Sequence, residues 1–200
     1  MHDTTNGDGR PETGGFHRLE AEYFTASDNT EAAHWTYRVD LQQYIPLWHT
    51  RRALALRGVL VVQDNENEDP IHFQRLLTND DPDLLRGYPD FRFRDEGLAV
   101  LTAEYRWPLW AWREAESTGL DAYLFTDVGQ VFDEYADIRG SSLTESYGGG
   151  IRLLNSSGNF SARLEIAWSE EGTQLRIRGD QVFEYLKGGL FHGRDQVPSR

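Results

Sequence analysis

Cysteine is absent from this 200-residue chain, and lysine occurs only at position 187. The first absence excludes a disulfide framework and thiol chemistry. The scarcity of lysine leaves arginine to carry almost all of the positive charge, and its planar guanidinium suits paired carboxylates in a sheltered interior. The chain also lacks a run of 18 apolar residues, which excludes a transmembrane helix. Transmembrane strands stay open, because their lipid-facing and interior-facing residues alternate.

Motifs for enzymatic or cofactor chemistry are missing as well. The six histidines are scattered without the spacing of metal ligands, and the chain has no Gly-x-Ser-x-Gly elbow and no phosphate-binding loop. A net charge of −13 and a pI near 4.8 argue against nucleic acid as a partner. We therefore predict a protein that is not an enzyme, holds no metal or cofactor and binds no nucleic acid.

Aromatic residues are numerous for so polar a chain, with six Trp, nine Tyr and ten Phe. Several occupy the ends of strand-like segments: Tyr44, Trp48, Trp107, Trp110, Trp112, Phe183 and Tyr185. This placement is typical of the aromatic girdles of membrane barrels. Aromatics in the core of a soluble sheet are the alternative interpretation.

Alternation of apolar and polar residues organises most of the chain. Residues 1–15 form a Gly-, Asp- and Thr-rich lead-in that we expect to be disordered. Residues 16–183 are predicted to form one β-barrel domain, and 184–200 a C-terminal extension. Turn signals divide the domain into eight expected strands at 16–26, 34–47, 51–63, 98–110, 120–132, 145–155, 160–170 and 174–183.

Strand length favours a membrane over a soluble sandwich. Most of the expected strands reach the ~9–11 residues that a tilted strand needs to cross a bilayer, whereas strands in globular proteins average ~5–6. We therefore predict an all-β fold, an antiparallel transmembrane barrel with eight strands in this chain. The alternative is a soluble eight-stranded barrel that binds a small ligand, which requires an apolar inner face and a polar outer one.

A long polar loop, from about 64 to 97, carries the most distinctive residues. Structureless loops of this length are uncommon in compact domains and are usually functional or disordered. This loop contains Leu85-Arg86-Gly87-Tyr88, and the following two strands contain Glu104 and Asp127. An arginine on a loop and carboxylates on a barrel wall together suggest a latch.

Five short motifs in order resemble the C-terminal barrel of the bacterial surface antigen family, the BamA/TamA-type outer-membrane assembly proteins. They are Leu85–Tyr88, Leu101–Leu109, Phe125–Gly129, Gly148–Leu153 and Ala162–Trp168. The resemblance implies the bacterial outer membrane as location, the lipid bilayer as surroundings, and a role in outer-membrane protein insertion, assembly or translocation, with outer-membrane proteins as substrates.

The resemblance also implies residue roles. In the family, the Arg-Gly-aromatic tip of a long outer loop folds into the barrel, where the arginine meets a glutamate and an aspartate. Arg86, Glu104 and Asp127 match these three positions. Phe183 matches the terminal aromatic residue of the strand signal that the assembly machinery reads, although here residues 184–200 follow it.

Family barrels have sixteen strands, whereas this chain supplies eight. The eight strands form either a small closed barrel or half of a larger one, completed by a second copy of the chain or by upstream strands. The interior of an eight-stranded barrel is just wide enough for side chains. The many inward charges and the loop that carries Arg86 would crowd it, so we favour the larger barrel, including a homodimer of sixteen strands.

Overall fold

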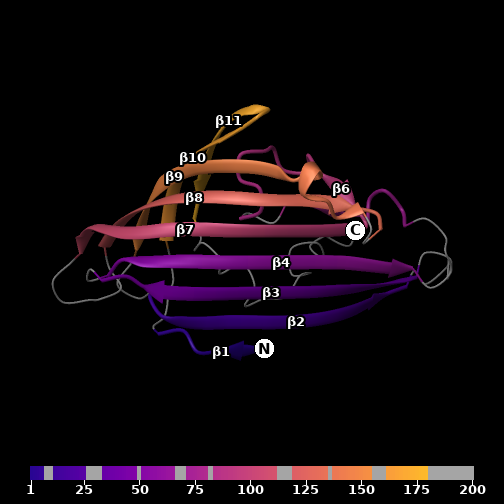
Figure 1. Ribbon diagram of the computed structural model, residues 1–200, viewed down its shortest axis with the longest axis horizontal. Helices are drawn as coiled ribbons and strands as arrows, with labels where there is room; N and C mark the ends of the chain where they lie inside the picture. Colours follow the sequence, from indigo (N-terminus) through magenta and orange to yellow (C-terminus); the bar gives the residue numbers. More distant parts are fainter. Residues whose placement is uncertain are drawn as a thin grey trace, which may run out of the picture.

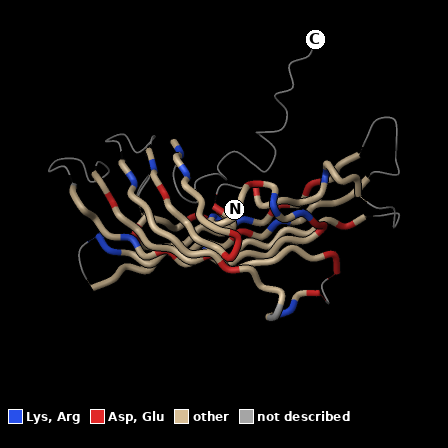
Figure 2. The backbone as a smooth tube through the Cα atoms, turned by 90° about the horizontal axis from the view of Figure 1, so that it is seen from above, with Lys and Arg blue, Asp and Glu red and all other residues tan. Residues whose placement is uncertain are grey.

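The computed structural model describes residues 1–6, 11–25, 33–48, 51–65, 71–80, 83–111, 119–134, 137–154 and 161–179. Eight long strands follow one another in an antiparallel meander that curves into a trough (Figures 1 and 2). They are β2 (Gly14–Phe24), β3 (His34–Pro46), β4 (Ala53–Asn65), β7 (Gly97–Ala111), β8 (Gly119–Phe132), β9 (Thr144–Leu154), β10 (Ser161–Ser169) and β11 (Gly172–Arg178). The predicted all-β fold is confirmed, and no helix in the described residues is long and apolar enough to cross a membrane.

A ninth strand, β1 (His2–Asp3), was not predicted. It pairs antiparallel with His17 and Phe16 of β2 at the margin of the sheet. Thr4 and Asn6 continue this contact, because their backbone N–H groups donate to Gly15 and Thr13 carbonyls. At these residues the structure differs from the expected disordered lead-in. The signal was invisible in the sequence, since a two-residue strand has no periodicity to detect.

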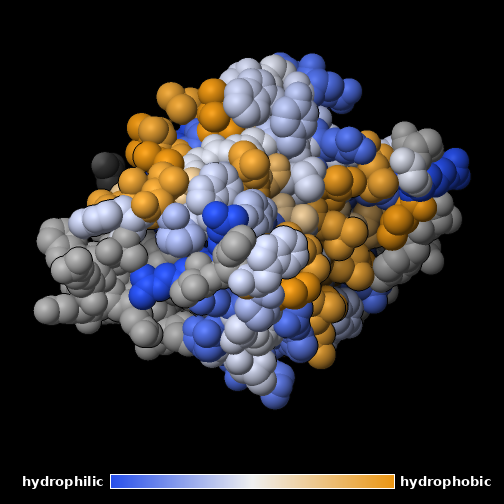
Figure 3. Space-filling view, turned by 60° about the vertical axis from the view of Figure 1, so that its left-hand side comes forward, coloured by the Kyte–Doolittle hydropathy of each residue, from blue (hydrophilic) through white to orange (hydrophobic). Residues whose placement is uncertain are grey.

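The sheet has an inverted distribution of polarity. Its concave face buries charged and polar side chains, among them Arg38, Asp40, Gln42, Arg57, Glu104, Arg106, Asp121, Asp127, Arg152, Arg163 and Glu165. Its convex face exposes Leu, Ile and aromatic side chains, including Leu41, Leu60, Leu101, Leu124, Ile151, Leu164 and Leu175 (Figure 3). This is the reverse of the face pattern that a soluble ligand-binding barrel requires, so that alternative is wrong.

Aromatic residues on the convex face lie toward the strand ends. At the end that joins β2 to β3, the rings of Tyr23, Trp35 and Tyr37 lie together, with centroid distances of 5.0 Å and 6.1 Å between successive pairs. At the opposite end, Trp48 and Trp110 are exposed. Tyr44, which we expected in this girdle, instead faces inward and is buried, because its position in β3 has the same parity as Asp40 and Gln42.

The connection between β4 and β7 turns back onto the concave face. We call its described residues, 71–80 and 83–96, the inner loop. It contains a small two-stranded sheet of β5 (Leu77–Thr78) and β6 (Arg94–Asp95). Asn79 fastens its two arms together, donating from Nδ2 to the Pro89 carbonyl at 3.0 Å and accepting from the Phe93 backbone N–H at 3.1 Å. The loop is therefore folded, not structureless.

The sheet is open along its margins within the described residues. Its order runs from β1 and β2 at one margin to β11 at the other, and no described residue of β11 pairs with β1 or β2. In Figure 1 these margins lie at the bottom and the top of the trough. Predicted residues Phe183, Tyr185 and Trp112, and the C-terminal extension, lie outside the described residues.

Candidate functional site: the Arg86 network

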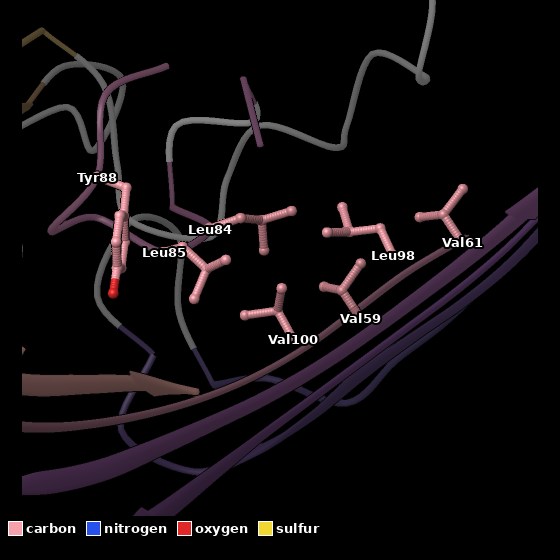
Figure 4. Packing of buried hydrophobic residues seen from close by; sticks show 7 residues of the cluster. All are labelled: Val59, Val61, Leu84, Leu85, Tyr88, Leu98 and Val100. Atoms are coloured by element: carbon pink, nitrogen blue, oxygen red, sulfur yellow. The ribbon is translucent and has the colours of Figure 1, made fainter. Parts of the chain in front are cut away.

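The inner loop presses a tight turn against the barrel wall. The Tyr88 backbone N–H donates to the Leu85 carbonyl at 3.0 Å, and Leu85 has a left-handed backbone with φ of 51°. Such a conformation is strained for leucine and persists only where packing holds it. The packing is visible in Figure 4, where Leu84, Leu85 and Tyr88 lie over the wall. The wall side of this cluster consists of Val59, Val61, Leu98 and Val100.

Arg86 extends from this turn and binds Asp127 of β8 with three donors. Its Nη2 donates to Oδ1 at 2.8 Å, and its Nε donates to Oδ2 at 3.1 Å. Its own backbone N–H also donates to Oδ2, at 3.0 Å. The two side-chain bonds form the bidentate fork that gives charge-assisted pairs both strength and directional specificity. Asp127 therefore fixes the loop backbone and the arginine side chain together.

Two further carboxylates share the other end of the guanidinium. Nη1 of Arg86 donates to Oε2 of Glu104 on β7 at 3.0 Å and to Oε1 of Glu165 on β10 at 3.5 Å. All four side chains are at most 1% exposed. One loop arginine thus contacts acids on three wall strands, β7, β8 and β10.

Each carboxylate has partners of its own on the wall. Asp127 accepts from the hydroxyls of Thr102 at 3.0 Å and Ser146 at 3.3 Å. Glu104 accepts from Nε of Arg106 at 2.6 Å, and Glu165 accepts from the Tyr123 hydroxyl at 2.9 Å. These bonds hold the acids in place, so that the site is arranged by the strands and not by Arg86 alone.

A second ion pair ties the inner loop to the same wall. Nη1 of Arg163 on β10 lies 2.7 Å from Oδ1 of Asp83 and 3.5 Å from Oε1 of Glu165. The loop thus contributes Asp83 toward a wall arginine and Arg86 toward wall acids. Both loop residues are fully buried, and each lies against an opposite charge of the wall.

Close approach of the loop depends on Gly87. A Cβ at this position would lie 2.6 Å from Cβ of Ser146 and 2.7 Å from the Trp168 carbonyl oxygen. Glycine is required here by space rather than by a left-handed backbone, since φ of Gly87 is not positive. Its carbonyl accepts from the Ser169 hydroxyl at 2.8 Å, and the Tyr88 hydroxyl donates to the Glu145 carbonyl at 3.2 Å.

An aromatic ring completes the site beneath the guanidinium. Cζ of Arg86 lies 3.4 Å from the centroid of the Phe125 ring. The ring has room because β9 carries glycine beside it: a Cβ on Gly148 would lie 2.5 Å from Cζ of Phe125. A cation over an aromatic face adds to the attraction of the carboxylates.

The charge state of Arg86 follows from its surroundings. Arg86 lies on the loop, outside the membrane-spanning strands. Burial alone would lower its pKa, but the carboxylates of Asp127, Glu104 and Glu165 outweigh burial and raise the pKa well above its ordinary value. The surrounding carboxylates therefore hold the guanidinium in its charged form.

The structure brings together six of the seven residues predicted from the sequence. Leu85, Arg86, Gly87 and Tyr88 meet Glu104 and Asp127 as described, whereas Phe183 lies outside the described residues. Sequence reasoning missed Glu165 and Asp83 as parts of the site. Glu165 was recognisable as an inward charge by its parity, but parity does not say which inward charge the loop reaches. No group of His, Asp or Glu suited to a metal occurs among the described residues.

The polarity of the sheet and its aromatic ends define a class of protein. Long strands with an apolar convex face, aromatic ends and a charged interior belong to integral β-barrel proteins of the outer membrane. The chain belongs to the Omp85 superfamily: the sequence profile of the Omp85 superfamily domain matches residues 1–184. A search of curated proteins found no match.

Among solved structures, the fold is similar to that of BamA from Haemophilus ducreyi, crystallised without POTRA domains 1–3. The TM-score is 0.69 at 13% sequence identity, and the match covers 90% of this chain and 40% of that one. This chain therefore spans well under half of the BamA chain that it resembles. The likeness establishes the shared barrel fold, and the family places the protein in the bacterial outer membrane.

Proposed function

We propose that the protein takes part in the insertion, assembly or translocation of proteins at the outer membrane. The observation that carries the proposal is the inner loop, whose arginine is fastened by acids of three wall strands. A loop held in this way occupies the concave face where a diffusion pore or a ligand pocket would need open space. The sheet margins, in contrast, offer backbone groups to a further strand, as strand addition to another polypeptide requires.

In this proposal Leu85, Arg86, Gly87 and Tyr88 form a latch, and Glu104 and Asp127 are its receiving groups. The latch stiffens the wall by cross-linking β7, β8 and β10 through one guanidinium. A stiff wall keeps its margins at a fixed separation, so that strand addition at those margins has a defined template. Superfamily membership and the fold shared with BamA support this role.

Reconstitution tests the proposed function. The purified chain is placed in bilayer vesicles of bacterial phospholipid, and a urea-unfolded small outer-membrane barrel is added as substrate. We expect substrate folding, followed by heat-modifiable gel mobility, to be faster than in empty vesicles. Arg86→Ala should reduce this acceleration, whereas Arg92→Ala, which removes an exposed pair with Glu171, should retain it. Equal folding rates in loaded and empty vesicles would overturn the insertion role.

We further propose that Phe183 acts as the terminal aromatic residue of the strand signal read by the assembly machinery. Its support is its position at the end of the last alternating segment, 174–183. Phe183→Ala should lower the amount of chain recovered from the outer membrane while leaving refolding of the purified chain in detergent unchanged. A parallel loss in both measurements would instead indicate a general folding role.

A further inference from the structure

The two margins of the sheet, β2 and β11, are complementary in strand direction and in charge. A β-sheet margin in lipid cannot stay unpaired, because its backbone N–H and C=O groups have no water to bind. The N-terminal residues solve this problem for only part of β2: His2, Asp3 and Thr4 pair with His17, Phe16 and Gly15. The remainder of the β2 margin, Arg18–Phe24, has no strand beside it within the described residues.

This uncovered segment matches β11 in length and direction. β11 spans seven residues, Gly172–Arg178, and Arg18–Phe24 has the same length. Because an even number of long antiparallel strands separates them, β2 and β11 run in opposite directions. Both segments also lie toward the end of the sheet where β2 finishes and the β10–β11 hairpin turns. An antiparallel pairing of the two margins therefore meets no mismatch of direction. The register that places Glu20 opposite Arg178 aligns Glu20–Phe24 with Gln174–Arg178.

The inward side chains of the two margins are complementary in charge. β2 presents Glu20 and Glu22 on the concave side, and β11 presents Arg176 and Arg178. Three of these groups have an ion-pair partner within the chain: Glu20 pairs with Arg18, and Arg176 and Arg178 lie 3.0 Å and 3.9 Å from Asp90. Other atoms of these three side chains, Oε2 of Glu20, Nη1 of Arg176 and Nε of Arg178, are shielded from solvent without a hydrogen-bond partner among the described residues. A register that places Glu20 opposite Arg178 also places Glu22 opposite Arg176, and it keeps inward residues facing inward.

The same chain cannot readily supply both sides of this pairing. β2 and β11 stand at opposite margins of the trough in Figure 1. An eight-stranded closed barrel has space for little more than its own side chains, whereas here the concave face already holds the inner loop with Leu84, Leu85 and Arg86 fully buried against one part of the wall. Closing the trough on itself would need the volume that the loop occupies.

We propose that β2 of one copy pairs with β11 of a second copy, and reciprocally, so that two chains close a barrel of sixteen long strands. A two-fold axis along the barrel relates the copies, and it makes the two seams identical and leaves no margin open. Each seam joins the acidic β2 margin of one copy to the basic β11 margin of the other. In this assembly a substrate strand adds only where one of the two seams opens, so strand addition under the proposed function competes with the pairing. The pairing itself does not depend on insertion activity: an inactive dimer would remove the proposed function and leave the pairing intact.

Cysteine crosslinking tests the pairing cleanly, because the chain has no cysteine of its own. In the register above, outward-facing Ala21 lies opposite Ile177. A size-tagged Ala21→Cys chain and an untagged Ile177→Cys chain are refolded together in detergent and oxidised. We expect a covalent heterodimer from the mixture and no dimer from either variant alone, since like margins do not meet. Leu101→Cys, which is exposed on the convex face away from both margins, is the collision control mixed with Ala21→Cys.

The double variant Ala21→Cys/Ile177→Cys separates the alternatives. A dimer linked at both seams supports the proposal. A monomer with an internal crosslink would show self-closure and overturn it, and so would a chain that folds by heat-modifiable mobility yet forms no crosslink in any mixture. Crosslinks equal to those of Leu101→Cys would also overturn it, as random collision.

Charge reversal then tests the proposed complementarity without relying on one variant that could misfold. Glu20→Arg should lower the crosslinked fraction about two- to fivefold, because like charges directly opposite each other destabilise a strand pair. Combining Glu20→Arg with Arg178→Glu should restore it. Failure of the combined variant to recover, with folding intact, would overturn this register.

Discussion

Arg86 contacts acids of three wall strands, more than any other side chain in the part of the chain that the structure describes. Arg86→Ala would leave Asp127, Glu104 and Glu165 buried without their shared cation. Breaking a buried pair in this way costs about 3–5 kcal/mol. We expect a matching loss of unfolding free energy in detergent, measured by urea titration of tryptophan fluorescence.

Arg86→Lys refines this prediction. Lysine retains the charge but lacks the guanidinium fork that binds Asp127. The free energy of unfolding of Arg86→Lys should therefore lie between those of the wild type and Arg86→Ala. Arg92→Ala is the control, since its pair with Glu171 has side chains 50% and 33% exposed and exposed pairs contribute about 0–1 kcal/mol. An equal effect of Arg86→Ala and Arg92→Ala would contradict the buried network.

Gly87 is predicted to be required for the close approach of the turn to the wall. Gly87→Ala places a methyl group against Cβ of Ser146 and the Trp168 carbonyl, so the turn must withdraw and carry Arg86 away from Asp127. Overpacking of this kind costs about 1–3 kcal/mol, and the loop should become more sensitive to protease. Gly140→Ala is the matched control, because a Cβ there meets nothing within 4 Å. Similar stability of the two variants would show that the close approach is not limiting.

At the scale of elements, the inner loop is expected to dock and release as a unit. Leu85 belongs to one buried cluster with Val59 and Val100 of the wall, beside the Arg86 network, and Leu85→Ala should cost about 2–5 kcal/mol for a buried leucine. If either substitution releases the loop, it removes both the packing of Leu85 and the ion pairs of Arg86. We therefore expect Leu85→Ala/Arg86→Ala to cost less than the sum of the single changes. Additive losses would show that the contacts are independent, and Phe73→Ala, at an exposed loop residue, controls for loop truncation.

The elements also show how far the sequence could be interpreted. The eight long strands followed from alternation and turn signals. A latch was suggested by an arginine on a loop that is followed by two acid-bearing strands, and the roles of Arg86, Glu104 and Asp127 were implied by the resemblance to the bacterial surface antigen family. β1, Asp83 and Glu165 were not identified. A short strand and a particular ion pair arise from how the chain curves in space, which period-two alternation does not encode. Tyr44 was misassigned because its aromatic type was weighed above its inward parity.

For the whole molecule, the inverted polarity of the sheet means that stability depends on contact between the convex face and the surrounding lipid. Leu60 faces outward near the middle of β4, and Asp64 shares its face at the end of the same strand. A charge on the lipid-facing surface costs ~2–4 kcal/mol at the bilayer midplane and ~0–1 near the interface. Leu60→Arg should therefore lower the stability measured by urea unfolding in vesicles far more than Asp64→Arg, which replaces one charge by another.

Measuring the same two variants in detergent micelles and in vesicles decides whether the bilayer causes the difference in their stability. In detergent micelles, whose apolar region adapts to a charge more readily than a bilayer does, the difference between Leu60→Arg and Asp64→Arg should shrink. Equal penalties for the two variants in vesicles would mean that the convex face of β4 does not contact the hydrocarbon core. The convex surface would then need a protein partner to cover Leu41, Leu60 and Leu101, which are all exposed in the isolated chain.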